Sequence, residues 1–136
     1  MFDLGIAIPR LFVSLLAGLF IGFTRKKYPA GIRTFTLICI GSTIFTLISI
    51  DPDLAAGQNS FDPTRVISQI VTGIGFIGAG VIWKSQARLG GLTTAAAIWT
   101  TAALGILVGL GEFVLAAITA ILMVVILYSK KYFPEI

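Results

Sequence analysis

The chain has 136 residues, of which 57% are hydrophobic and 12% are charged, with a net charge of +4 at pH 7. A soluble domain averages about 45–50% apolar and about 25% charged residues, so this chain has too little charge to cover a soluble fold. Cys39 is the only cysteine and there is no histidine, which excludes a disulfide framework, a thiolate metal site and a Cys/His catalytic pair.

The apolar residues are gathered into long blocks, which is typical of helices that cross a bilayer. We predict an all-α, polytopic membrane helix bundle that forms one transmembrane domain over residues 1–136. The expected helices cover about 4–23, 32–50, 66–83, 92–109 and 113–128. The last two share a stretch too long for one span of about 20 residues, and Gly109-Leu110-Gly111-Glu112 separates them. Because the fifth segment is short, four helices are the alternative.

Charged residues sort to opposite ends of a five-helix bundle. The first connection, the third connection and the tail are basic, with Arg25, Lys26, Lys27, Lys84, Arg88, Lys130 and Lys131. The other end is acidic, with Asp3, Asp51, Asp53, Asp62 and Glu112. The positive-inside rule therefore predicts an N-terminus outside and a C-terminus in the cytoplasm, and a four-helix count would break this sorting. The basic excess is a topology signal and an anionic-lipid contact, so we expect the lipid bilayer, and no nucleic acid, as partner.

The third segment carries four glycines on two faces of one helix. At about 100° per residue, Gly73 and Gly80 fall on one face, and Gly75 and Gly78 fall on roughly the opposite face. Small residues on two sides permit close approach of two neighbours, so we predict that this helix is central in the bundle. Gln69 projects near the Gly73/Gly80 face and is expected to bond to a neighbouring helix or to line a wet cavity.

The spacing Gly73-x-Gly75-x-x-Gly78 also matches a dinucleotide-binding fingerprint. That fingerprint needs a preceding strand, a surrounding βαβ unit and an acid about 20 residues on, and the sequence predicts none of them. Close packing is a sufficient explanation of the glycines, and no cofactor is expected.

Four threonines occupy the fourth segment, at Thr93, Thr94, Thr100 and Thr101. Such side chains either bond back to carbonyls of their own helix and pack, or they supply hydroxyls to a transport pathway.

Charged residues at membrane depth are functional hypotheses. Arg33 opens the second segment, as a snorkelling anchor or as a functional cation. Asp62 and Arg65 open the third segment, where Asp62 fits the N-cap and Pro63 the first helical position. A second interpretation joins Asp62 and Arg65 to Arg10 in an outer network that closes the bundle or accepts a cation. Because Mg²⁺ needs only one or two carboxylates, Asp62 is the candidate metal contact.

Several blocks appear in the order found in the MgtC/SapB family of bacterial inner-membrane proteins. They are Ala30-Gly31-Ile32-Arg33-Thr34, Asp62-Pro63-Thr64-Arg65, the stretch 69–81, and Gly91-Leu92-Thr93-Thr94-Ala95-Ala96. Over nearly its whole length the chain resembles the transmembrane domain of that family. The resemblance implies a multi-pass protein of the bacterial inner membrane that is linked to growth in low magnesium, survival inside phagocytes and inhibition of the membrane ATP synthase. It also implies functional positions at Arg33, Asp62, Arg65, Gln69, Thr93 and Thr94.

Two features depart from the family pattern. Members often carry Glu-Arg-Glu after the first helix, where this chain has Thr24-Arg25-Lys26-Lys27, so no ion pair is expected there. Many members also have a cytoplasmic C-terminal domain, which is not expected after Lys131. Five small helices bury little surface alone, so we expect a homodimer.

Two functions follow from these features. The first is an accessory or regulatory protein of magnesium homeostasis that acts through helix contacts with a larger membrane complex, such as the ATP synthase or a transporter. The second is a small oligomeric channel or transporter for Mg²⁺ or another cation, lined by Gln69 and the threonines of the fourth segment. We expect no enzyme, because the sequence offers no nucleophile with a nearby base.

Overall fold

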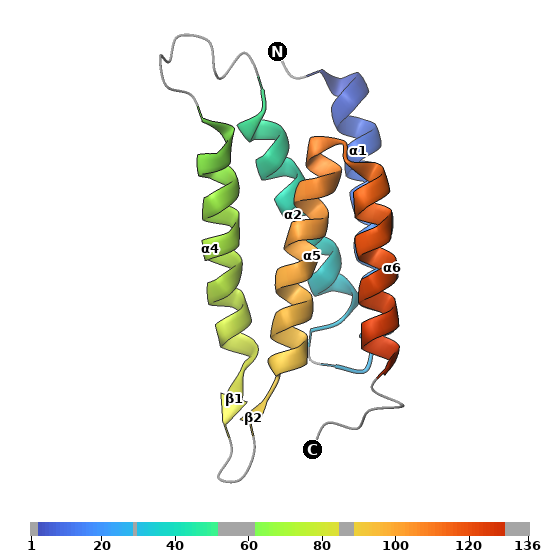
Figure 1. The fold of residues 1–136 in the computed structure, drawn as a ribbon, viewed down its shortest axis with the longest axis vertical. Coiled ribbons are helices and arrows are strands. Elements are labelled where there is room, and N and C mark those ends of the chain that lie inside the picture. The colour runs from blue at the N-terminus through green and yellow to red at the C-terminus, as the bar shows by residue number, and fades with distance from the viewer. Residues whose placement is uncertain (1–2, 29, 52–61, 85–88, 130–136) are drawn as a thin grey trace.

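The computed structural model describes residues 3–28, 30–51, 62–84 and 89–129 (Figure 1). In that part of the chain there are five helices: α1 (Leu4–Thr24), α2 (Ile32–Ser49), α4 (Pro63–Val81), α5 (Leu92–Leu110) and α6 (Phe113–Ser129). A two-residue antiparallel ladder joins α4 to α5, where β1 (Trp83–Lys84) pairs with β2 (Leu89–Gly90). Trp83, the expected last residue of the third helix, lies instead in this ladder, opposite Gly90.

The helices are long and apolar enough for a membrane protein. Four of them, α1, α2, α4 and α5, have 21, 18, 19 and 19 residues and the hydropathy of membrane spans. The fifth, α6, is equally apolar but has 17 residues, which is the lower limit for crossing the hydrocarbon core. The predicted all-helical membrane bundle, with five helices rather than four, is confirmed.

The first helix begins at one end of the bundle and the last helix finishes at the other (Figure 1). The connection that carries Lys26 and Lys27 lies at the same end as the β1–β2 ladder, and Glu112 lies at the opposite end. This placement is the one that the charge sorting requires. Other residues used in that sorting, Asp53, Arg88, Lys130 and Lys131, lie outside the described residues, and the outside-to-inside direction stays a prediction.

The N-terminus of α4 follows the predicted capping chemistry. Asp62 precedes the helix in an extended conformation, its carboxylate accepts a hydrogen bond from the backbone N–H of Thr64, and Pro63 occupies the first turn. The helix therefore begins three residues before the expected start at Val66. It ends at Val81, because Trp83 enters the β1–β2 ladder.

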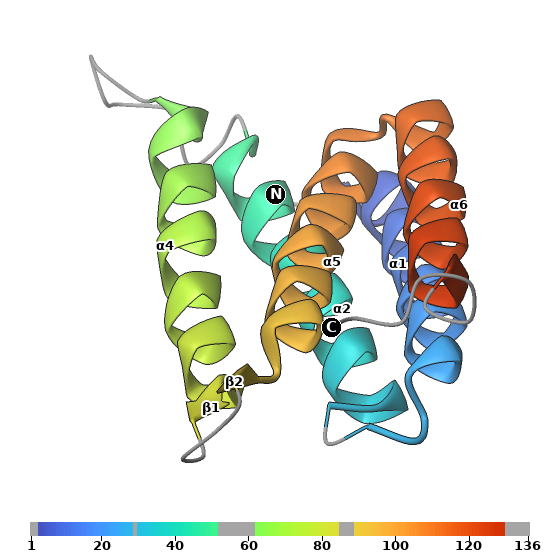
Figure 2. The ribbon, with the colours of Figure 1, turned by 60° about the horizontal axis from the view of Figure 1, so that its bottom comes forward.

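The centre of the bundle is shared by α2 and α5, which pack against each other; α1 lies against one side of this pair and α4 against the other (Figure 2). Half of α2 is buried, whereas only Ile70, Ile74 and Gly78 are buried in α4. The prediction that the glycine-rich third segment is central was therefore wrong. A glycine permits the backbones of two helices to come close together but does not require it. In this bundle the close backbone contacts are made by glycines of helices other than α4.

One such approach joins α1 to α2. A Cβ added at Gly18 would lie 2.6 Å from Thr36 Cα, and one added at Gly22 would lie 2.6 Å from Ile32 Cα. These distances leave no room for a side chain, so the two backbones are in direct contact. The spacing Gly18-x-x-x-Gly22 is the small-residue pattern that permits such packing between membrane helices.

A matching approach joins α5 to α2. A Cβ at Gly109 would lie 2.6 Å from Thr46 Cβ, and one at Gly105 would meet the backbone carbonyl of Cys39. The buried Thr43 hydroxyl lies 2.8 Å from the Gly105 carbonyl and 3.0 Å from the Cys39 carbonyl of its own helix, so it shares its proton between α5 and α2. Two small-xxx-small faces, on α1 and α5, thus hold α2 in the middle.

Candidate functional site

The candidate site is the membrane-facing side of α4. There a groove of about 440 Å³ runs between α2 and α4. Its lining is mostly apolar, from Ile38, Phe45, Val66, Ile70, Ile74 and Ile77, together with Gly41, Ser42, Gln69 and Gly73. The buried residues of α4 are Ile70, Ile74 and Gly78, and Ile67 and Val81 pack against the core while partly exposed.

Two polar side chains, Ser42 and Gln69, line this groove. Ser42 is 2% exposed, and its hydroxyl has no hydrogen-bond partner within the described residues. Gln69, seven residues into α4, is exposed to the membrane side. A polar group without a partner in an apolar medium costs free energy, and intramembrane polar side chains are commonly satisfied by another helix or by water.

The glycines of α4 are open rather than packed. A Cβ added at Gly73, Gly75 or Gly80 would meet no atom within 4 Å, whereas one at Gly78 would lie 3.7 Å from Ala95 Cβ. Among the described residues of one chain, therefore, Gly78 is the only one of these four glycines that approaches a neighbouring helix, and the packing predicted for the other three is not seen there. Each glycine lowers intrinsic helix propensity by about 1 kcal/mol relative to alanine, and in a single chain these three gain no contact in return.

At the basic end, Arg25 is an unpredicted buried cation. It is 3% exposed, donates a hydrogen bond of 2.5 Å to Thr94 Oγ1, and places its guanidinium 3.8 Å from the centre of the Tyr28 ring. Thr94, a predicted site residue, is therefore held by the chain segment that follows α1. The sequence groups Arg25 with Lys26 and Lys27 as a topology signal and an anionic-lipid contact. The available signal was the preceding Gly22, which brings the end of α1 against the start of α2.

At the acidic end, Arg10 binds the end of α5. Its Nη1 donates a hydrogen bond of 2.5 Å to the Gly109 carbonyl, one of the last carbonyls of that helix. A cation at a helix C-terminus also interacts favourably with the helix dipole. The following Gly111 has a φ of +86°, and a Cβ there would lie 2.8 Å from the Arg10 guanidinium. Arg10 thus closes the turn between α5 and α6.

Asp62 and Arg65 form a separate, local group. The Asp62 carboxylate accepts hydrogen bonds from the hydroxyl and the N–H of Thr64, at 2.7 and 2.9 Å, and these bonds with nearby Arg65 lower the pKa of Asp62. Arg10 lies on α1, which is separated from α4 by α2 and α5 (Figure 2), so the structure does not bring Arg10 to Asp62. The described residues contain no cluster of three or more acidic, cysteine or histidine side chains that would hold a metal ion.

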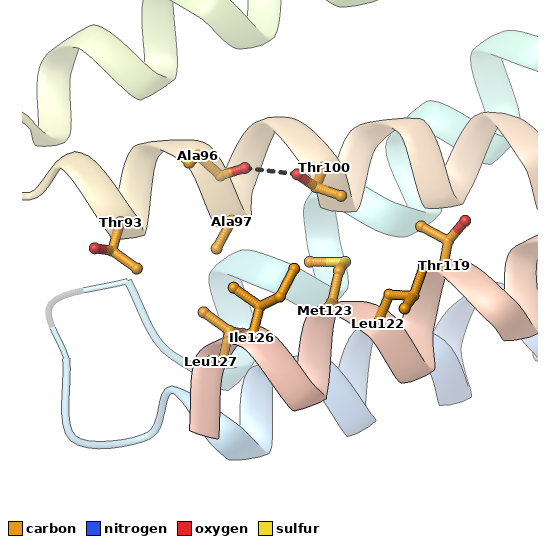
Figure 3. A pocket seen from close by; sticks show the side chains of 9 residues that line it. All are labelled: Thr93, Ala96, Ala97, Thr100, Thr119, Leu122, Met123, Ile126 and Leu127. Atoms are coloured by element: carbon orange, nitrogen blue, oxygen red, sulfur yellow. Dashed lines mark hydrogen bonds between the residues drawn. The ribbon is translucent and has the colours of Figure 1, made fainter. Parts of the chain in front are cut away.

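The fourth-segment threonines lie away from Gln69. Thr93 and Thr100 line a groove of about 410 Å³ between α5 and α6, whose floor is formed by Met123 and neighbouring aliphatic side chains (Figure 3). The Thr100 and Thr101 hydroxyls donate to the carbonyls of Ala96 and Ala97 in their own helix. Gln69 and these threonines therefore do not line one pathway within a single chain. Arg33 is exposed in the first turn of α2.

Comparison with known proteins identifies relatives over most of the chain. The MgtC family model matches residues 11–136. Protein MgtC of Brucella abortus (strain 2308) is 44% identical over 114 residues, which cover 82% of this chain and 45% of that protein. Protein SrpB of Synechococcus elongatus is 40% identical over 80% of this chain and 66% of its own length. The Escherichia coli (strain K12) protein named "Putative magnesium transporter YhiD" is 38% identical over 88% of this chain and 58% of its own length.

The chain thus spans about half the length of the first of these relatives. No solved structure matches it.

Proposed function

The chain belongs to the MgtC family, and from this premise we propose that it is an accessory or regulatory membrane protein of magnesium homeostasis. It acts without catalysis, in the inner membrane of a bacterium, by contact between its helices and those of a larger membrane complex such as the ATP synthase or a transporter. The surface of contact is the open side of α4.

The observation that carries this proposal is that polar side chains and an open glycine line the α2–α4 groove. Gln69 projects from α4 at membrane depth, and the buried Ser42 hydroxyl across the groove has no partner within the described residues. Beside them Gly73 leaves room for another backbone. Small residues for close approach and polar side chains for hydrogen bonding are the two features by which membrane helices recognise one another. A partner helix in this groove supplies both kinds of contact.

Growth in low magnesium tests the proposal. In a strain that lacks the native gene, Gly73→Leu should abolish growth that depends on the chain, because the new side chain fills the groove. The variant should keep wild-type abundance and thermal stability, since a Cβ at Gly73 would have no atom of a neighbouring described helix within 4 Å. The matched control is Val125→Leu, a lipid-exposed position on α6. Wild-type growth of the Gly73→Leu strain would contradict the proposal.

The sequence also predicts a homodimer, in which a second copy of the chain would occupy the same groove. A Gly73→Cys variant in a Cys39→Ser background places one thiol in the groove. Disulfide-linked pairs of the chain in native membranes would put a second copy against α4. An adduct to a larger protein would identify the complex instead.

The second candidate is a small ion channel or transporter, and the two polar side chains of the α2–α4 groove favour it. Its pathway would form between copies, because the threonines of α5 lie elsewhere. Proteoliposomes that contain only the purified chain test it. A Mg²⁺ or monovalent-cation flux that disappears in Gln69→Leu would replace the accessory role, with Mg²⁺ as cargo. Asp62, at the outer end of α4, stays the predicted contact for an entering cation.

A further inference from the structure

A third groove lies at the basic end of the bundle, between α1 and α6, far from the candidate site on α4. It has a volume of about 340 Å³ and lies between two helices that run side by side in both views (Figure 1, Figure 2). Its lining consists of Leu19, Phe20, Phe23, Thr24, Val124 and Tyr128. No function assigned above uses these residues.

The groove changes in character with depth. Leu19 lies four residues before Phe23 in α1, and Val124 lies four residues before Tyr128 in α6. Each of these two aliphatic side chains is therefore about 6 Å deeper in the bundle, measured along its helix axis. The deep part is aliphatic and aromatic, and the polar atoms of the lining, the hydroxyls of Thr24 and Tyr128, are at the rim. The Thr24 hydroxyl already donates to the Ile21 carbonyl, so the rim offers little to a polar molecule that would have to enter whole.

A lysine lies against the ring of one residue that lines the groove. The Lys26 amino group lies 4.6 Å from the centre of the Phe23 ring, and Phe23 forms part of the groove wall. The adjacent Lys27 is also exposed, and the sequence from Thr24 to Arg33 contains no acid. The positive charge at this point is therefore not neutralised by an acid of the same segment.

We propose that this groove binds an anionic phospholipid, with the lipid phosphate on the Lys26 amino group and an acyl chain against Phe20 and Val124. The ligand must place an anion at the membrane surface and an apolar chain below it. A phospholipid has this shape and already lies in the layer that the groove faces. The site is independent of the function proposed for α4.

Native mass spectrometry of the purified full chain, incubated with phosphatidylglycerol or with phosphatidylcholine, tests this site. The wild-type chain should retain phosphatidylglycerol preferentially. Lys26→Gln should reduce that retention about fivefold, the effect of one lysine near an anionic lipid surface. Lys27→Gln, the matched control, removes the same charge from a residue that does not stand over Phe23, and it should have a smaller effect. Val124→Phe, which fills the deep part, should reduce retention of both lipids.

Three results would overturn the inference. Equal retention of phosphatidylglycerol and phosphatidylcholine would show that the site does not recognise an anionic headgroup. Equal loss in Lys26→Gln and Lys27→Gln would show diffuse attraction to the basic end rather than a site. Displacement of the lipid by inorganic phosphate at the concentration of the lipid would show that the groove contributes nothing. If Val124→Phe fails to fold, the comparison of lipid retention by Lys26→Gln and Lys27→Gln still tests the inference.

Discussion

The guanidinium of Arg25 donates a hydrogen bond to Thr94 Oγ1 across 69 residues of sequence, and so ties the segment after α1 to the first turn of α5. Both side chains are buried. A buried cation needs such partners, because its desolvation otherwise opposes folding. The aromatic ring of Tyr28 adds a cation–π contact to the guanidinium.

Thr94→Val should therefore destabilise the bundle. Valine keeps the shape of threonine but offers no acceptor to Arg25, and loss of a buried hydrogen bond to a charged group costs about 1–3 kcal/mol. Thermal unfolding of the purified chain in detergent measures the change. In the control, Thr100→Val, the lost hydroxyl served only its own helix. Equal effects of the two variants would show that the contact with Arg25 contributes nothing.

Arg10→Gln should loosen the turn between α5 and α6. The substitution removes the charged donor from the Gly109 carbonyl, with an expected loss of about 1.5–3 kcal/mol. The same unfolding measurement applies, with Arg65→Gln as the control because Arg65 is exposed at the start of α4. If Arg10→Gln unfolds at the wild-type temperature, the helix-capping role of Arg10 is wrong.

Leucine substitutions should separate packed from open glycines. Gly105→Leu forces a side chain against the α2 backbone, and overpacking of this kind costs about 1–3 kcal/mol or prevents folding. Gly73→Leu should leave stability unchanged or slightly increased, since leucine has the higher helix propensity. Yield and unfolding temperature in detergent report both. A destabilised Gly73→Leu monomer would mean that α4 packs more closely than described.

The direction of insertion can be tested with single thiols in a Cys39→Ser background. The positive-inside rule predicts that Glu112→Cys reacts with a membrane-impermeant maleimide in intact cells. Lys27→Cys should react only after the membrane is opened. The reverse pattern would invert the predicted topology while leaving the five-helix bundle intact.

The sequence by itself determined the class of the protein and the positions of its helices. Long apolar blocks, the Gly109–Glu112 break and the Asp62-Pro63 cap are local signals, and each acts on the residues beside it. The observed helices accordingly begin and end within three residues of the expected bounds. Charge sorting predicted five helices rather than four, because it depends only on the order of loops along the chain.

The tertiary structure alone decided which helices meet. Glycines at helical spacing indicate that a face can be approached, but they do not identify the neighbour, and so α4 was expected at the centre that α2 and α5 share. For the same reason Arg25 was counted with the basic residues of a connecting loop, although it bonds to Thr94, and one of two interpretations joined Arg10 to Asp62, although Arg10 binds Gly109. Hydrocarbon solvates every apolar helix face almost equally well, so lateral order is set by contacts between residues that are distant in sequence.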